Sequence, residues 1–114
     1  MMRLKSEILV AAIVRRANVE GAFAAVTKRG AEEAGAIFVK VARLDRTADL
    51  YAPAPQAIFD EEAAGERLFE RVMSQAPEFE VDERLLRERN FDGDLWIVEI
   101  EDRAGRCFVD LAKL

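Results

Sequence analysis

The fold is decided by residues 95–102, which read LWIVEIED. Alternate residues of a strand point to opposite faces of its sheet, so Trp96, Val98 and Ile100 share one face of this stretch. The pattern predicts a strand whose Trp96 face lies in the core. A short turn then leads to a predicted last strand over residues 107–111, and the two strands together form a hairpin.

Working outward toward the N-terminus, the sequence predicts one helix and three strands. Ser6 is a good N-cap residue, and an apolar face repeating every three to four residues predicts a helix over 7–18. Alternating apolar residues predict strands over 22–29, 35–43 and 47–52. Short polar turns separate these strands, so we expect an antiparallel meander.

Two further helices are expected between the meander and residue 95. Prolines after residue 52 end the sheet, and the next apolar residues are spaced by four: Ala64, Leu68 and Val72. This spacing predicts a helix over 60–75. Asp82 is the expected N-cap of a third, short helix that stops at Gly93, with Val81 and Leu86 as a hydrophobic staple.

These elements define one α+β domain over residues 1–114. We expect an antiparallel sheet of about five strands, with two or three helices packed on one face. A chain of 114 residues buries roughly 65% of the surface that it exposes when unfolded, which is enough for one core.

The composition excludes much of the chemistry that enzymes use near neutral pH. The chain has no histidine and one cysteine, so a Ser-His or Cys-His nucleophile pair and the usual zinc sites cannot form. Acidic residues outnumber basic ones 22 to 17, which gives a net charge of −5. This balance disfavours non-specific binding to nucleic acid or to an anionic membrane.

The N-terminal sequence admits a signal peptide, because basic residues precede an apolar run over residues 8–14. The run ends at Arg15 and Arg16 without a small-residue cleavage site, and a bilayer span needs about 20 residues. The lone Cys107 cannot form an internal disulfide. We therefore expect a cytoplasmic protein without a membrane span.

Three segments carry a resemblance to a known family: the helix at residues 4–16, GAIFVKV at 35–41 and FDGDLWIVEIED at 91–102. The chain resembles the domain-of-unknown-function family numbered 1491, which consists of small alphaproteobacterial proteins. The resemblance covers nearly the whole chain and implies a bacterial, single-domain, cytoplasmic protein. It implies no activity and no functional residue.

The first candidate site is an acidic cluster near the predicted hairpin, formed by Asp92, Asp94, Glu99 and Glu101. Converging carboxylates bind Mg²⁺ or Ca²⁺, so the cluster suggests a metal-assisted hydrolase. The competing interpretation is a helix end, a turn and a solvated strand face. The spacing of a calcium-binding EF-hand loop is missing. We favour the second interpretation and expect no metal ion and no cofactor.

Two other groups of residues suggest chemistry. Cys107 lies near Arg103 and Arg106, which would lower a thiol pKa, but its place in an apolar strand favours a buried, slowly reacting core residue. Arginines 84, 87 and 89 on the third helix suggest RNA binding. Acidic residues among them favour ion pairs along the helix instead, such as Arg84 with Glu88.

The leading hypothesis is a non-enzymatic module that binds proteins or regulates them. Trp96, Tyr51 and Phe38 are the candidate interface residues, because large aromatic residues are favoured at interfaces. Few helices are available to cover two apolar strands, so one sheet face is expected to pair with a second copy as a homodimer. The hydrolase and the RNA-binding domain are the alternatives.

Overall fold

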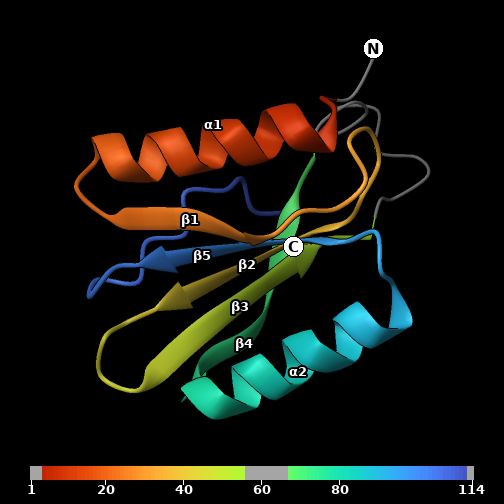
Figure 1. Cartoon of the computed structure of the whole chain (residues 1–114). Helices are drawn as coiled ribbons and strands as arrows, with labels where there is room; N and C mark the ends of the chain where they lie inside the picture. The colour runs from red at the N-terminus through yellow and green to blue at the C-terminus, as the bar shows by residue number, and fades with distance from the viewer. Residues whose placement is uncertain (1–3, 56–66, 113–114) are drawn as a thin grey trace.

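The computed structural model describes residues 4–55 and 67–112, which form a five-stranded sheet with one helix on each side (Figure 1). The elements in chain order are α1 (Ser6–Val19), β1 (Phe23–Lys28), β2 (Ile37–Ala42), β3 (Thr47–Pro53), β4 (Phe69–Pro77), α2 (Glu78–Phe91) and β5 (Trp96–Glu101). The α+β class is confirmed, as are the helix over 7–18 and the strands over 22–29, 35–43, 47–52 and 95–102.

The strand order is β1-β5-β2-β3-β4, so the expected meander is wrong. β5 lies between β1 and β2 and runs parallel to β2, while the other neighbours are antiparallel. β5 carries large apolar side chains on both faces, as a central strand with both faces covered must.

Each face of the sheet has its own core. On the α1 face, Val10, Ile13 and Ala17 of α1 pack with Trp96, Val98 and Ile100 and with other residues, which confirms the predicted core face of β5. On the α2 face, Val81 and Leu85 pack with Phe38, Leu50 and Ile97. The helices therefore cover opposite faces of the sheet, whereas the sequence placed them on one.

The predicted last strand over 107–111 is wrong. This segment has no strand pairing with β5; it crosses the α1 face beside α1, where Phe108 joins the core. A single bridge links Leu111 to Phe69, and the Phe69 N–H donates to Asp110 at 2.9 Å. The segment thus covers the part of the α1 face that α1 does not reach.

The predicted helix over 60–75 is wrong where the structure describes it. Residues 69–75 belong to strand β4, and the earlier part, 60–66, lies outside the described residues. β4 pairs with β3 through two register shifts near Leu50. An irregular strand does not show clean alternation, and its apolar residues therefore matched a helical spacing.

Helix α2 begins at Glu78, four residues before the predicted N-cap Asp82. Pro77 occupies the N-cap position, and the Glu78 N–H donates to Arg46 at 2.8 Å. The predicted staple is also wrong, because Val81 is buried while Leu86 is 57% exposed. The helix therefore starts directly after the proline that ends β4, and the predicted start at the acidic Asp82 is wrong.

Ser6 does not cap α1 with its side chain. The first N–H groups of the helix, those of Ser6 and Glu7, donate to the carbonyls of Glu33 and Glu32. The Ser6 hydroxyl is buried and instead donates to the Gly35 carbonyl at 2.6 Å. A loop before β2 therefore caps this helix through its backbone. Neither helix in the described part of the chain is long and apolar enough to cross a membrane.

Candidate functional site

The acidic cluster does not come together. Asp92 ends α2 and accepts a hydrogen bond from the Asp94 N–H at 2.9 Å, while Glu99 and Glu101 lie toward the far end of β5. At about 3.3 Å per residue, Asp94 and Glu101 are separated by roughly 20 Å along the strand. Within residues 4–55 and 67–112, no group of three or more Asp, Glu or Cys side chains is placed to hold a metal ion.

Glu99 belongs instead to a charged group around Lys40 of β2. Lys40 is 3% exposed, and its Nζ lies 2.7 Å from Asp82, 2.8 Å from Glu78 and 3.5 Å from Glu99. Two of these carboxylates come from α2 and one from β5. Lys40 therefore ties α2 to the sheet, and one lysine faces three acids.

This environment acts on the pKa of Lys40 in two directions. Burial lowers the pKa, because a buried ammonium loses its hydration, whereas hydrogen bonds to Asp82 and Glu78 and the charge of Glu99 raise it. The carboxylates prevail, so the pKa of Lys40 lies above its ordinary value. The ammonium remains charged at neutral pH and serves as a structural cation.

The three aromatic interface candidates are buried in the chain itself. Trp96 is 1% exposed, Tyr51 3% and Phe38 7%. The indole N–H of Trp96 donates to the Ala31 carbonyl at 2.7 Å, and the Arg29 guanidinium lies 5.2 Å from its ring centre. These side chains hold the sheet and the loop before β2 together.

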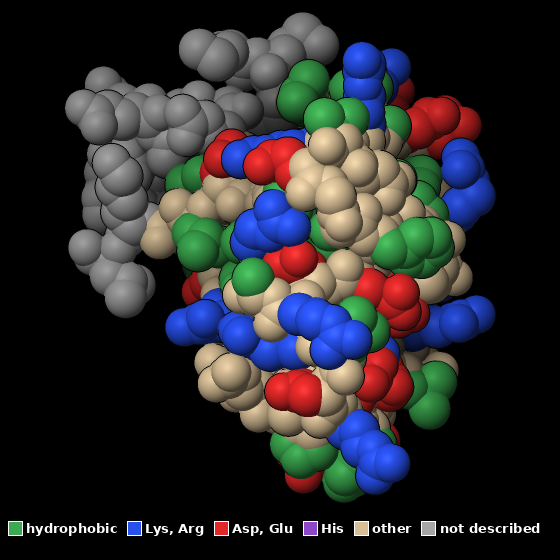
Figure 2. All heavy atoms as spheres, turned by 90° about the vertical axis from the view of Figure 1, so that its left-hand side faces the viewer, with side chains coloured by type: hydrophobic (Ala, Val, Ile, Leu, Met, Phe, Trp, Pro, Cys, Tyr) green, Lys and Arg blue, Asp and Glu red, His purple; other side chains and the backbone are tan. Residues whose placement is uncertain are grey.

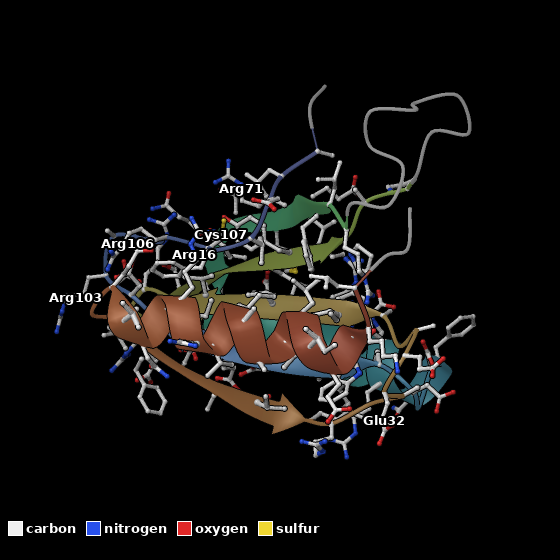
Figure 3. The ribbon with its side chains drawn as sticks, turned by 90° about the horizontal axis from the view of Figure 1, so that it is seen from above. Arg16, Glu32, Arg71, Arg103, Arg106 and Cys107 are labelled. Atoms are coloured by element: carbon white, nitrogen blue, oxygen red, sulfur yellow. The ribbon has the colours of Figure 1, made fainter. Side chains whose placement is uncertain are left out.

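Cys107 is half-buried, not buried, at the basic end of the α1 face. Seen from above, Arg16, Arg71, Arg103 and Arg106 lie at the same end of the molecule, and Glu32 lies at the other (Figure 3). Arg106 is paired with Asp102 at 2.9 Å and Arg16 with Glu20 at 3.5 Å. Nearby acids thus balance much of the positive charge around the thiol.

The Tyr51 hydroxyl lies close enough to Cys107 for the thiol to affect its pKa. The pKa of the Tyr51 hydroxyl is raised, first by burial and then by the neighbouring Cys107 and Asp49, while a hydrogen bond with Arg71 opposes the rise.

On α2, the predicted ion pair of Arg84 with Glu88 is confirmed at 2.8 Å. Where the sheet ends beside the turn after β5, basic and acidic side chains are intermixed on the surface (Figure 2).

Helix α2 leaves open the α2 face of β1 and of the end of β5, where Phe23, Thr27 and Glu101 are exposed. Helix α2 packs on β3 and β4, whereas α1 covers β1 and β5 on the opposite face (Figure 1). The side chains on this face define what we call the β1–β5 strip: Phe23, Ala25 and Thr27 of β1, and Ile97, Glu99 and Glu101 of β5. Of these, Ile97 is buried against α2. Phe23 is 59% exposed there.

A groove of about 250 Å³ runs between this strip and α2. Its apolar lining comes from Leu85, Leu86 and Ile97. One end carries Lys28 and Arg89, and the other carries Asp82 and Glu99. An apolar middle with opposite charges at its ends suits a partner segment that has both apolar and charged residues.

Neither this groove nor the role of Lys40 was predicted from the sequence. One signal for Lys40 was present, because it interrupts an otherwise apolar strand that reads IFVKVA. A lysine at such a position needs carboxylate partners, and the acids of the following helix were available. The groove itself left no local pattern, since it depends on which strands α2 covers.

The fold defines a class of small α+β proteins in which a mixed five-stranded sheet lies between two helices. The chain belongs to the family described as a protein of unknown function (DUF1491), whose model matches residues 4–110. The resemblance found in the sequence is thereby confirmed.

Solved structures of this family share the fold. A protein from A. tumefaciens, solved in solution, is 46% identical, covers 99% of this chain and 98% of its own, and superposes with a TM-score of 0.84. A crystal structure of a DUF1491 family protein from Caulobacter crescentus is 37% identical, with coverage of 98% and 100% and a TM-score of 0.80. No curated protein matches the chain.

Proposed function

We propose that the chain is a non-enzymatic, single-domain cytoplasmic module that binds another protein through the β1–β5 strip. The observation that carries the proposal is the difference between the two sheet faces. On the α1 face, α1 and residues 107–112 together cover the strands. On the other face α2 covers β3 and β4, and the groove beside it has an apolar lining.

The exposed apolar side chains beside the groove support a protein partner. Phe23 is 59% exposed at one margin and Leu86 is 57% exposed on the wall formed by α2. Apolar side chains grouped beside charged ones are typical of surfaces that bind proteins. Lys40 holds that wall in place through Asp82 and Glu78, so the groove is formed before a partner arrives.

The two alternatives receive less support from the geometry. The carboxylates of the hydrolase hypothesis lie at opposite ends of β5, where they cannot share one ion. An RNA-binding surface needs a continuous basic patch, whereas the arginines at positions 16, 43, 84 and 106 each pair with an acid.

The homodimer stays a prediction, with less surface available than the sequence suggested. The prediction requires an uncovered sheet face, whereas a helix packs on each face of the described sheet. Light scattering at micromolar concentration tests it. A mass of twice 12.8 kDa supports the dimer, and 12.8 kDa at every concentration removes it.

Site-specific photo-cross-linking tests the binding surface. A photoreactive amino acid at Thr27, which is exposed in the groove, should give a discrete covalent adduct with another protein in the native cell. The matched control carries the same group at Arg15, which is exposed on α1. An adduct from Thr27 alone supports the proposal. No adduct, or the same adducts from both positions, would overturn it.

A further inference from the structure

We infer that the occupant of the β1–β5 strip is one amphipathic helix of a different protein, with basic residues facing Glu99 and Glu101 and acidic residues facing Lys28 and Arg89. This inference rests on the proposed binding function and specifies the chemistry of the partner. It is argued from the dimensions of the strip, the state of the sheet edge and the placement of charge.

The strip has the dimensions of one helix. Two strands spaced by about 4.8 Å, with their side chains, present a band roughly 10 Å wide, which is close to the diameter of a helix. The six residues of β5 extend about 20 Å, the length of roughly 13 helical residues. The molecule already contains such a pair, because the 14-residue α1 packs on the same two strands from the other face.

The outer edge of β1 argues against an added strand. The Asn18 side chain accepts a hydrogen bond from the Ala24 N–H at 3.0 Å, and its amide donates to the Ala24 carbonyl at 3.5 Å. This side chain takes the place that the backbone of an incoming strand would need. Proteins commonly protect edge strands from such pairing. A partner therefore has to pack on the face of the strip.

Charge sets the character of the partner. Glu101 is exposed and Glu99 half-exposed at the end where β5 finishes, and both point to the α2 face. At the other end Lys28 Nζ is fixed by the carbonyls of Gly93 and Leu95 at 2.7 and 3.0 Å, near the exposed Arg89. A helix with basic residues toward the first end and acidic residues toward the second complements both.

A second copy of the chain fits this description less well. The apolar face of α1, with Val10, Ile13 and Ala17, is packed on its own sheet. The apolar face of α2, with Val81 and Leu85, is packed as well. Neither helix in the described part of the chain is free to enter the strip of another molecule, which favours a helix from a different protein.

The test uses synthetic peptides and the full chain. The probe is a fluorescent peptide of about 14 residues, with leucines at helical spacing, lysines near one end and glutamates near the other. Its comparison peptide has the same composition, with leucines at every second position. In fluorescence anisotropy the helical peptide should bind, and Leu86→Ala and Glu101→Lys should each weaken binding about tenfold. Glu80→Lys, an exposed change on the opposite side of α2, should leave binding unchanged.

Several outcomes would overturn the proposal that the partner is a helix. These are failure of the helical peptide to bind, tighter binding of the alternating peptide, equal binding to all variants, or a Thr27 adduct that contains two copies of this chain. The proposed function is judged separately. If Thr27 still cross-links to another protein and the helical peptide does not compete, the module binds proteins but not through a helix. If the cross-link is also absent, both proposals fail.

Discussion

Lys40 shows how one side chain determines the position of a whole helix. A buried ammonium is unfavourable unless carboxylates compensate it, and here α2 supplies two of them. Lys40→Met should lower the free energy of unfolding by about 1–3 kcal/mol. This is less than the roughly 3–5 kcal/mol typical when a buried ion pair loses a partner, because the carboxylates keep access to water. Urea denaturation at pH 8 measures it, with Lys5→Met of the exposed Lys5–Glu33 pair as the control.

The same residue predicts a pH dependence. Folding raises the pKa of Lys40, so its stabilisation is complete below the ordinary lysine pKa of about 10.4 and is lost as the pH rises through the higher folded-state value. The stability difference between the wild type and Lys40→Met should therefore shrink between pH 8 and pH 11. A difference that stays constant or grows over this interval would contradict the assigned charge environment.

Asp49 organises the irregular pairing of β3 with β4. It is 0% exposed and accepts hydrogen bonds from the Gln75 N–H at 2.7 Å and from Arg43 at 2.8 and 3.1 Å. Gln75 has a φ of 45°, in the left-handed region that a residue other than glycine rarely adopts. Asp49 therefore stabilises the shifted register of β4.

Asp49→Ala should cost about 3–5 kcal/mol, because Arg43 and the Gln75 N–H both lose their acceptor. Urea denaturation followed by circular dichroism measures the cost. Glu70→Ala, an exposed change on the neighbouring strand β4, should stay within about 0.5 kcal/mol. Equal effects of the two substitutions would show that Asp49 does not hold the bulge.

At the scale of elements, Trp96 joins β5 to the loop that caps α1. Its ring lies in the α1-side core, and its N–H bonds to Ala31 in that loop. Trp96→Ala should cost about 3–5 kcal/mol, as truncations of large core aromatics do, and Trp96→Phe should cost less. Circular dichroism has to follow the unfolding, since the chain has one tryptophan. A stable Trp96→Ala variant that has only lost a partner would place Trp96 in an interface.

The elements that the sequence predicted correctly are those whose side chains follow one period throughout. β5 alternates cleanly, and α1 keeps one apolar face, so local pattern and tertiary environment agree. The prediction for β4 was wrong because register shifts in its pairing with β3 break the alternation of apolar and polar residues. Phe69, Val72 and Met73 then match a helical period. Tertiary pairing with β3 overrides that local preference.

The candidate site was harder to predict than the elements. The pairing of β5 with β1 and β2 joins residues 59 to 78 positions apart, and no local pattern encodes such a choice. The groove depends on that pairing and on the placement of α2. Glu99 was a candidate site residue because of its charge. Its partner Lys40 could not be predicted, because the two residues are brought together only by the pairing of β2 with β5.

At the scale of the whole molecule, the two faces of α2 should respond differently to the same substitution. Leu85 and Leu86 are adjacent, but Leu85 is 6% exposed in the α2-side core and Leu86 is 57% exposed on the groove wall. Leu85→Ala should cost about 2–4 kcal/mol, because it leaves a cavity under the helix. Leu86→Ala should change stability by no more than about 0.5 kcal/mol, because little of its surface is buried on folding.

Thermal and urea unfolding of the two variants measure the difference, and photo-cross-linking from Thr27 shows whether function follows it. If the strip is a binding surface, Leu86→Ala remains folded and loses the cross-link. A large loss of stability in Leu86→Ala would mean that the exposed side of α2 supports the fold. An unaffected cross-link would mean that the partner contacts β1 alone. The combination of a folded Leu86→Ala variant and a lost Thr27 adduct is expected only if the exposed Leu86 side chain contributes to binding and not to folding.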